Sequence, residues 1–477
     1  MSTEELVARM DRARRRLAEH AALPVPSGLA DPDPGGTERW EAGQVWAHLA
    51  EFPAYWLHQV QTIVGAKADG VAEPIPFGRT KADAGRVAAI ERERHTDPAE
   101  LLRRVSVDLG AVREALHALP PDALDVRGEH PTRGEMPLRG IVEEFIVNHL
   151  EEHADQLDSL ELVTLDEIRQ AATRIRGAAV RTPLLRWDET TWLKPESLQP
   201  IGAFKMRGAY NLIASLSDEE RRRGVVTYSS GNHAQAVARS ARLLETKATI
   251  VMPENAPRVK VEGVQRDGAA IVFTGPGSEE RHRIALELVE RHGSVMVEPY
   301  DDRRIIAGQG TAGLEIAEDL PDVTSVVVPV SGGGLSSGVA TAVKALAPNA
   351  RLIGVEPELA ADARESLAAG EIVSWPAEQT TRTAADGLRV EHLGRLPFIH
   401  LRRYLDEIVT VTEEQMVDAI RQLATRARLV VEPSGAASMA AHLSGAAARA
   451  PGDDRRVVLI SGGNIDPHRL AEILTGA

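Results

Sequence analysis

The stretch Ser197-Leu-Gln-Pro-Ile-Gly-Ala-Phe-Lys205-Met-Arg-Gly-Ala209 sets one lysine among small and apolar residues, and a long run of alternating predicted strands and helices follows it. A single lysine in a sequence is usually a solvated surface charge, so Lys205 taken alone indicates no chemistry. Its interpretation depends on three glycine-containing turns further along the chain. Each of these turns comes directly after a predicted strand.

Short apolar runs rich in β-branched residues predict the strands, at 225–228, 248–252, 270–273, 325–329, 352–355 and 457–460. Helical patterns lie between them, which predicts an α/β fold whose sheet is largely parallel and covered by helices on both faces. Ligands of such folds bind beyond the carboxyl ends of the strands. The three turns lie at those ends.

Each turn suits one part of a single cofactor and its substrate. Ser229-Ser-Gly-Asn-His233 opens a helix, so its free N–H groups can receive a carboxylate. The glycines of Val330-Ser-Gly-Gly-Gly-Leu335 let the backbone wrap a phosphate. In Ser461-Gly-Gly-Asn464 a hydroxyl can meet a ring nitrogen. Glycine after a strand is usually just turn chemistry, but together with Lys205 these turns predict a pyridoxal phosphate site with Lys205 as its Schiff-base lysine.

Residues 163–477 resemble the fold type II pyridoxal phosphate enzymes, in the branch of the threonine dehydratases and serine racemases. The matching motifs are Gly202-Ala-Phe-Lys205, Ser229-Ser-Gly-Asn-His233, Ala307-Gly-Gln-Gly-Thr311, Ser331-Gly-Gly-Gly-Leu335, Gly354-Val-Glu-Pro357, Ala385-Asp-Gly387, Val431-Glu-Pro433 and Ser461-Gly-Gly-Asn464. The resemblance implies a large and a small open-sheet subdomain, with the small one at about 224–301.

The resemblance also implies a role for each matching residue. Lys205 would bind the cofactor covalently and Phe204 would flank its ring. Asn232 would bond the phenolic oxygen and Ser461 the pyridine nitrogen. The phosphate would lie on Ser331, Gly332, Gly333, Gly334 and Leu335, and the substrate α-carboxylate on Ser229, Asn232 and His233.

The residue at the ring nitrogen indicates the reaction. A neutral hydroxyl such as that of Ser461 does not keep the ring nitrogen protonated, whereas an acidic partner does. Loss of a β-substituent then competes well with reprotonation at Cα, with Lys205 as the general base. We therefore expect an ammonia-lyase that converts a β-hydroxy amino acid such as L-threonine or L-serine to a 2-oxo acid and ammonia.

Two residues keep other reactions open. Ser230 stands where serine racemase has its reprotonating serine, although serine at a helix start also serves as an N-cap. Arg281 falls where racemase and hydroxyaspartate dehydratase relatives have an arginine over the substrate pocket. It could pair with the second carboxylate of 3-hydroxyaspartate, or form a surface ion pair with Glu279 or Glu280. The alternatives are thus serine racemase and 3-hydroxyaspartate dehydratase.

The segment Glu356-Pro-Glu-Leu-Ala360-Ala-Asp362 resembles the divalent-cation loop of the same branch. Carboxylates of Glu356 and Asp362 with the carbonyl of Ala360 suit a hard cation such as Mg²⁺ or Ca²⁺. A merely solvated acidic loop is the other interpretation.

The N-terminal third carries helical patterns near 6–17, 45–63, 99–119 and 138–160, and no strand pattern interrupts them. They predict an all-α four-helix bundle over residues 1–160. His149 and His153 are four residues apart and continue an apolar helix face. Two histidines at this spacing on a helix commonly bind one metal ion together, and His48 is a candidate third ligand. Histidines on an apolar face are also often simple core residues.

This third resembles the DinB-like superfamily, including its mycothiol-dependent members, through Trp46-Ala-His48-Leu-Ala-Glu51 and His149-Leu-Glu-Glu-His153-Ala-Asp-Gln156. The resemblance implies that His48, His149 and His153 bind a divalent transition metal such as Zn²⁺ or Ni²⁺, with open positions for a thiol or water. A third possible function, metal-dependent thiol transfer, therefore centres on this domain. A bundle that keeps its histidines without a metal, or serves only in assembly, is the other interpretation.

The domain boundary is predicted near 160–163, because Thr164 and Glu167 form a capping box that starts a new helix. The second domain then covers 163–477.

Bulk composition limits the partners and the compartment. The 477 residues are 43% hydrophobic and 26% charged, with a formal net charge of −15 and no cysteine. This charge argues against nucleic acid and anionic membranes, and the missing cysteines exclude disulfides and thiolate ligands. The first ten residues hold no apolar signal region, so we expect a cytoplasmic protein. We also expect a homodimer with a small amino acid as substrate.

Overall fold

The computed structural model describes residues 1–32, 36–120, 122–229, 231–256, 258–275 and 278–476. The chain divides into two compact units, Met1–Leu162 and Val163–Ala477. Each unit has its own hydrophobic core. Among the described residues, none of the helices combines the length and apolar character that crossing a membrane requires.

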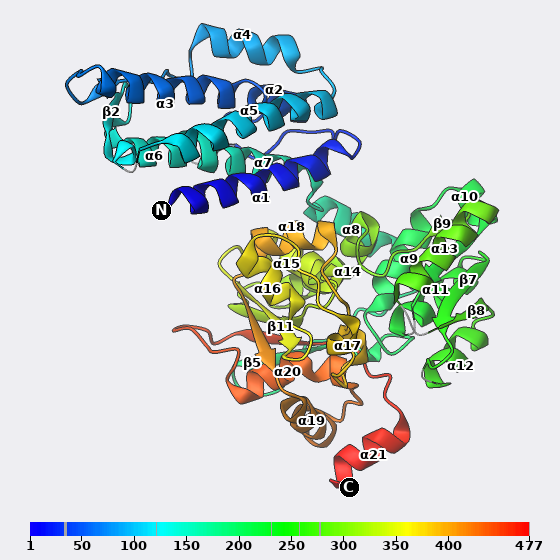
Figure 1. Ribbon diagram of the computed structural model, residues 1–477. Coiled ribbons are helices and arrows are strands. Elements are labelled where there is room, and N and C mark those ends of the chain that lie inside the picture. The colour runs from blue at the N-terminus through cyan, green and yellow to red at the C-terminus, as the bar shows by residue number, and fades with distance from the viewer. Residues whose placement is uncertain (33–35, 121, 230, 257, 276–277, 477) are drawn as a thin grey trace. The chain divides into compact units, whose positions relative to one another are not determined.

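The first unit is built mainly from helices, and the longer ones lie side by side (Figure 1). They are α1 (Thr3–Ala21), α2 (Ala42–Leu49), α3 (Phe52–Ala68), α4 (Ala84–Glu93), α5 (Pro98–Ala118), α6 (Leu138–Val142) and α7 (His149–Glu161). A π-helical segment, Glu143–Asn148, joins α6 to α7 without a break. The apolar stripe of α1 is buried as its periodicity predicted, and the helical bundle expected from the sequence is confirmed.

Three details of the first unit were predicted wrongly. The helix expected near 45–63 is two helices, because Pro53 can stand only in the first turn of α3. Helix α4 was missed. Strands β1 (Ile75–Pro76), β2 (Arg127–His130) and β3 (Gly134–Pro137) form a small sheet where the sequence indicated no strands. Strands of two to four residues are too short to display an alternating pattern.

The second unit contains two sheets. The larger has the order β12-β11-β10-β13-β5-β4 and the smaller β8-β7-β6-β9. Every strand pair in them is parallel except β4–β5. The strands are β4 (Leu185–Arg186), β5 (Thr191–Pro195), β6 (Val225–Tyr228), β7 (Ala248–Pro253), β8 (Ala270–Thr274), β9 (Val295–Met296), β10 (Ser325–Pro329), β11 (Arg351–Pro357), β12 (Glu407–Val411) and β13 (Arg456–Ile460).

Helices cover both faces of these sheets, which confirms the predicted architecture (Figure 1). Val327 of β10 belongs to one core cluster, whereas Val326 and Val328 belong to the cluster on the opposite face. The helices are α8 (Leu165–Arg174), α9 (Lys205–Ser215), α10 (Asp218–Arg223), α11 (Asn232–Leu243), α12 (Arg258–Arg266), α13 (Ser278–His292), α14 (Arg303–Asp319), α15 (Gly334–Leu346), α16 (Asp362–Ala369), α17 (Ala377–Thr380), α18 (Arg395–Tyr404), α19 (Glu413–Gln422), α20 (Pro433–Ser444) and α21 (Pro467–Thr475). The capping box of Thr164 and Glu167 starts α8 as predicted.

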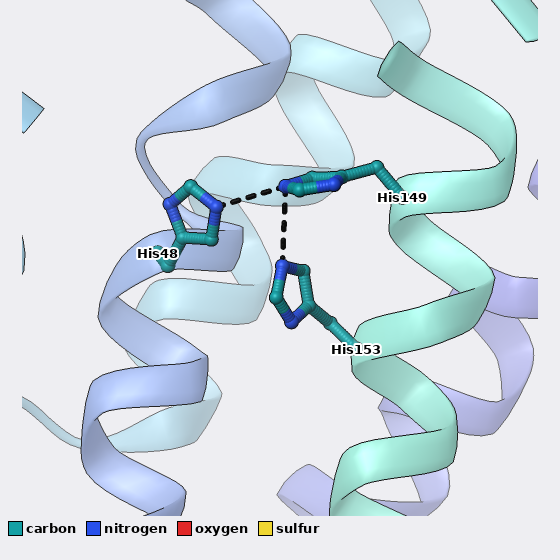
Figure 2. A group of neighbouring side chains, drawn as sticks. All are labelled: His48, His149 and His153. Atoms are coloured by element: carbon teal, nitrogen blue, oxygen red, sulfur yellow. Dashed lines mark hydrogen bonds between the residues drawn. The ribbon is translucent and has the colours of Figure 1, made fainter. Parts of the chain in front are cut away.

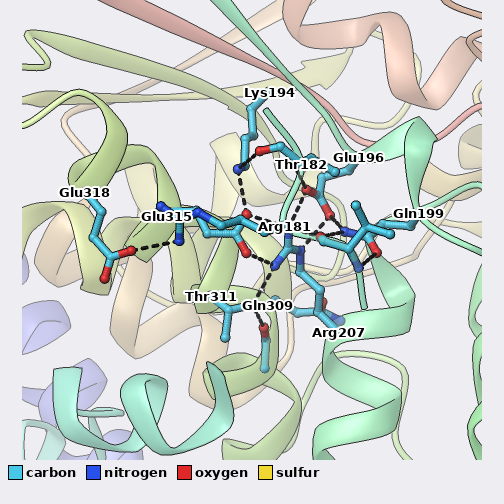
Figure 3. Close-up of polar contacts among 12 residues, drawn as sticks. Arg181, Thr182, Lys194, Glu196, Gln199, Arg207, Gln309, Thr311, Glu315 and Glu318 are labelled. Carbon is cyan, nitrogen blue, oxygen red and sulfur yellow. Dashed lines mark hydrogen bonds and ion pairs between the residues drawn. The ribbon is translucent and has the colours of Figure 1, made fainter. Parts of the chain in front are cut away.

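A buried ionic network fixes the helix that begins at Lys205 (Figure 3). The Arg207 guanidinium of α9 donates to Glu196 at 2.7 Å and to Glu315 of α14 at 2.6 Å. Lys194 of β5 donates to the same Glu315 at 2.6 Å. The Arg207 and Glu196 side chains are fully buried. Buried charges hold one geometry when each has a partner, so this network fixes where α9 begins relative to β5 and α14.

Candidate active site and candidate metal centre

Lys205 is the first residue of α9, and its side chain is half-buried. Its Nζ donates to the carbonyl oxygen of Pro299 at 2.5 Å. Among the described residues no carboxylate pairs with it. The Phe204 ring centre lies 5.2 Å from Nζ. Burial therefore lowers the pKa of Lys205 to about 7, which makes the amine a nucleophile and a proton acceptor at neutral pH.

Backbone and amide hydrogen bonds tie two of the three turns to the Lys205 segment. Phe204 N–H donates to the Ser461 carbonyl at 3.1 Å, and Gly463 N–H donates to the Gly202 carbonyl at 2.8 Å. The Asn464 amide donates to Asn232 Oδ1 at 2.9 Å. The turn after β13 and the start of α11 thus lie against the lysine segment, as the sequence predicted for ends of parallel strands.

The third turn is a tight glycine bend at the start of α15. Ser331 has a φ of 56° and Gly333 one of 90°, both in the left-handed region. A Cβ on Gly332 would overlap the ring of Tyr300, the residue after the Pro299 that binds Lys205. The bend therefore requires glycine and presents N–H groups at the positive end of a helix. These groups fit a phosphate, and with Lys205 and Ser461 they fit pyridoxal phosphate.

In the first unit, three histidine rings meet (Figure 2). The Nε2 atom of His149 lies 2.8 Å from His48 Nε2 and 3.1 Å from His153 Nε2. His48 comes from α2, and the other two come from α7. Burial, and then the charge of His153, keeps the pKa of His48 and of His149 well below the usual value. Their neutral rings can therefore offer lone pairs to a metal.

Aromatic side chains pack against the histidine cluster. Trp40 stacks on His153 with ring centres 5.9 Å apart, and Phe52 meets the His149 ring edge-on at 4.7 Å. Imidazole nitrogens lie about 2.0–2.1 Å from bound zinc. The candidate ligand atoms lie within 4.8 Å of one another, so all three nitrogens can reach one ion with small side-chain movements.

Comparison with known proteins identifies both units. Residues 175–463 match the family described as pyridoxal-phosphate dependent enzyme, and residues 9–157 match the DinB superfamily. The chain belongs to the pyridoxal-phosphate dependent enzymes. Both resemblances drawn from the sequence are thereby confirmed.

This pyridoxal-phosphate dependent enzyme is similar to proteins that match about two thirds of its chain. The L-threonine ammonia-lyase of Thermotoga maritima is 42% identical over 320 residues, which are 66% of this chain and 78% of that protein. The L-threo-3-hydroxyaspartate ammonia-lyase of Saccharomyces cerevisiae is 39% identical over 321 residues, which are 66% of this chain and 97% of that protein. The structure of maize serine racemase aligns with a TM-score of 0.62 at 39% identity, and covers 66% of this chain and 97% of that one.

The residues predicted to hold the substrate carboxylate lie at the start of α11. The side chain of one of them, His233, is engaged elsewhere. The ring of His233 is turned away, because its Nε2 donates to the Val297 carbonyl at 3.0 Å. Burial, and then the Lys205 charge, lowers the pKa of His233 to about 3, so the ring stays neutral. Only its backbone N–H is left to bind a carboxylate. Ser229 lies in the turn and accepts from Gly231 N–H at 3.2 Å, while Ser230 lies outside the described residues.

Arg281 of α13 is half-buried, not a fully exposed surface charge. Burial lowers its pKa, and the charges of Glu391, Tyr228 and Glu280 oppose that shift. Tyr228 is the last residue of β6 and directly precedes Ser229. The ring of His282, the residue after Arg281, lies 4.6 Å from the ring of Tyr228, so this part of α13 is near the turn predicted to receive the substrate.

The residues of the predicted cation loop come together in part. Glu356 is fully buried and accepts from the N–H groups of Ala363 at 3.2 Å and Arg364 at 2.8 Å. Burial first, and then the Asp362 charge, raises the pKa of Glu356, and burial raises that of Asp362 to about 7. Asp362 Oδ2 is buried and lacks a hydrogen-bond partner among the described residues. Ala360 lies in the turn between the two acids. A bound cation would offset the burial and the mutual repulsion that raise these pKa values.

Sequence reasoning missed one buried charge beside the site. Lys260 of α12 pairs with Asp386 and lies 3.6 Å from Glu432. Glu432 in turn accepts from the Asn232 amide at 2.5 Å. The carboxylates lie in two quoted motifs, but an isolated lysine carries no sequence signal that distinguishes it from a surface charge.

Proposed function

We propose that this pyridoxal-phosphate dependent enzyme removes the β-hydroxyl and the amino group of a hydroxy amino acid such as L-threonine or L-serine, and releases a 2-oxo acid and ammonia. The observation that carries the proposal is the half-buried Lys205 amine, whose pKa burial lowers to about 7 and which has no acidic partner among the described residues. The identity to two ammonia-lyases supports the same reaction class.

Each residue has one task in this reaction. Pyridoxal phosphate, when bound, supplies an electron sink for the Cα of the amino acid. Lys205 Nζ takes the Cα proton, because it is unprotonated above about pH 7. The N–H groups at the start of α11 hold the α-carboxylate. The glycine bend before α15 holds the phosphate, and Ser461 offers a neutral hydroxyl to the ring nitrogen.

Replacing the lysine tests the proposal. Lys205→Ala should lose the cofactor absorbance band and the formation of 2-oxo acid from L-serine and L-threonine. Lys247→Ala is a matched control, because Lys247 is an exposed lysine of the same unit. Full turnover by Lys205→Ala would overturn the assignment.

The half-buried Arg281 favours a second candidate substrate, 3-hydroxyaspartate, whose additional carboxylate a guanidinium can bind in bidentate fashion. Arg281→Met should then raise KM for 3-hydroxyaspartate at least tenfold and leave KM for L-serine within about twofold. Equal effects on both substrates would exclude this pairing. Racemisation through Ser230 is the further alternative, and it requires D-serine that disappears selectively in Ser230→Ala.

The histidine cluster is the observation behind a metal centre. We assign His48, His149 and His153 as ligands of a divalent transition metal such as Zn²⁺ or Ni²⁺ on their convergent Nε2 atoms. Metal content of the whole protein should fall in His149→Ala/His153→Ala, and metal retained by that variant would exclude these ligands. Metal-dependent thiol transfer remains the function that such a centre would add.

Three further assignments complete the proposal. Glu356, Ala360 and Asp362 are assigned to Mg²⁺ or Ca²⁺, because two buried carboxylates lie close enough there for the charge of Asp362 to raise the pKa of Glu356. Asp362→Asn should abolish any rise in thermal stability caused by these ions. The homodimer and the cytoplasmic location stay predictions, which light scattering and cell fractionation measure.

A further inference from the structure

The three histidines of the first unit all turn Nε2 toward one another, so their Nδ1 atoms face the surrounding helices (Figure 2). Each Nδ1 has an oxygen atom near it. The distances are 2.7 Å from His153 to Gln156 Oε1, 3.5 Å from His48 to Glu51 Oε2 and 4.0 Å from His149 to Glu152 Oε2. A neutral imidazole carries one hydrogen, so the group at Nδ1 decides whether Nε2 keeps its lone pair.

Gln156 determines which ring nitrogen of His153 carries the hydrogen. The Gln156 Nε2 group donates to the Asp31 carbonyl at 3.1 Å, which turns its Oε1 toward the ring. An amide oxygen only accepts, so the hydrogen of His153 must be on Nδ1. The Nε2 lone pair of His153 is then directed into the cluster. Both side chains are buried.

Glu51 places an accepting oxygen near Nδ1 of His48, as Gln156 does for His153. His48 Nδ1 and Glu51 Oε2 are both buried and have no hydrogen-bond partner among the described residues, although they lie 3.5 Å from each other. The other oxygen of Glu51 pairs with Arg79, which holds the carboxylate in place. A charged carboxylate only accepts, so it favours the hydrogen of His48 on Nδ1 and leaves the Nε2 lone pair free.

The two lone pairs then meet at one ring. His48 Nε2 and His153 Nε2 both face His149 Nε2, which has one hydrogen at most to offer them. A cation bound by all three nitrogens gives every lone pair a partner. It also draws the Nδ1 hydrogens toward the oxygens behind them, so the unpaired His48 and Glu51 atoms become a hydrogen bond.

We propose that Glu51 and Gln156 are the positioning residues of the three-histidine centre, which hold the hydrogens of His48 and His153 on Nδ1 and aim both Nε2 lone pairs at a divalent transition metal. This inference rests on the metal centre assigned above. Glu152 is the matched control, because it is 4.0 Å from His149 and its side chain is 41% exposed.

The test uses the full-length protein, stripped of metal with a chelator and titrated with Co²⁺. Its readouts are the dissociation constant and the visible absorption spectrum of the bound Co²⁺. Loss of an outer hydrogen-bond partner typically weakens a metal site about 10–100-fold. We expect this loss, and shifted Co²⁺ bands, in Glu51→Ala and in Gln156→Leu. Glu51→Gln keeps the volume and an accepting oxygen, so it should recover part of the affinity, whereas Glu152→Ala should change the affinity less than about threefold.

The outcomes separate the two proposals. If the wild type binds no Co²⁺, or His48→Ala/His153→Ala binds it as tightly, the metal centre itself is overturned. If the wild type binds Co²⁺ through the histidines but Glu51→Ala and Gln156→Leu match Glu152→Ala in affinity and spectrum, only the positioning roles are overturned. Should Glu51→Ala fail to fold, Glu51→Gln and Gln156→Leu decide the matter by the same two readouts.

Discussion

The amine of Lys205 makes cofactor capture depend on pH. Burial lowers its pKa from the ordinary lysine value to about 7, so the amine is protonated below pH 7 and free above it. The rate at which metal-free, cofactor-free protein takes up pyridoxal phosphate should rise about tenfold per pH unit up to pH 7 and level off above it. Rapid-mixing absorbance measures this rate. A rise that continues to pH 10 would mean that the lysine has an ordinary pKa.

Gly332 is a second single residue on which the site depends, because the site has no room for even one added methyl group at this position. A Cβ at this position would overlap the Tyr300 ring, and moving Tyr300 also moves the neighbouring Pro299 that accepts from Lys205. Gly332→Ala should weaken cofactor binding more than tenfold, as measured by fluorescence titration. Gly110→Ala, where the methyl meets no atom within 4 Å, should keep the wild-type affinity and would expose any general effect of glycine replacement.

At the scale of elements, the Arg207 network joins α9 to β5 and α14 (Figure 3). Arg207→Met leaves Glu196 buried without its cation, which should lower the free energy of unfolding by about 3–5 kcal/mol. Denaturant unfolding measures the loss. Arg181→Met removes an exposed arginine that pairs with Glu318 at 2.8 Å, so it should cost less than about 1 kcal/mol. Equal losses in the two variants would contradict the role of burial.

Helices α1 and α7 are joined by buried contacts of His20 with two acidic residues, and the stability that these contacts provide depends on pH. Burial lowers the pKa of His20, but hydrogen bonds to Asp158 at 2.8 Å and Glu161 at 2.7 Å outweigh it, and the net shift is upward. A raised pKa adds stability that is complete below the unfolded value near 6.5 and is lost as pH rises through the folded value. The first unit should therefore lose thermal stability from pH 6 to pH 9. His20→Gln should flatten that dependence in calorimetry, and an unchanged slope would assign it to other groups.

How far the sequence predicted these elements depends on where their partners lie. The apolar strand β10 was found because burial on both faces leaves a continuous run of valines. Strand β5 was missed, because its Lys194 is balanced by Glu315, which is 121 positions away. The candidate site was predicted to the same extent. Local glycine and serine motifs revealed the three turns, whereas the role of Lys260 depends on its pairing with Asp386 and Glu432, which lie far away in the sequence.

At the scale of the whole molecule, the two units have separate cores and separate candidate ligands. A ligand that binds only the folded state stabilises the unit that holds it. Calorimetry should therefore resolve two unfolding transitions, of which pyridoxal phosphate raises one and Co²⁺ the other. Lys205→Ala should remove the first response alone, and His149→Ala/His153→Ala the second alone. A single transition that both ligands raise together would show that the units unfold as one.

The π-helical segment Glu143–Asn148 ends directly before His149. A π turn holds one residue more than an ordinary turn, and each residue of an α-helix advances the direction of its side chain by about 100°. If the same six residues were wound as an ordinary α-helix, the residues after them would turn by about 100°, which would swing His149 and His153 together away from His48. The winding of one short segment thus decides whether the three imidazoles can share a single ion.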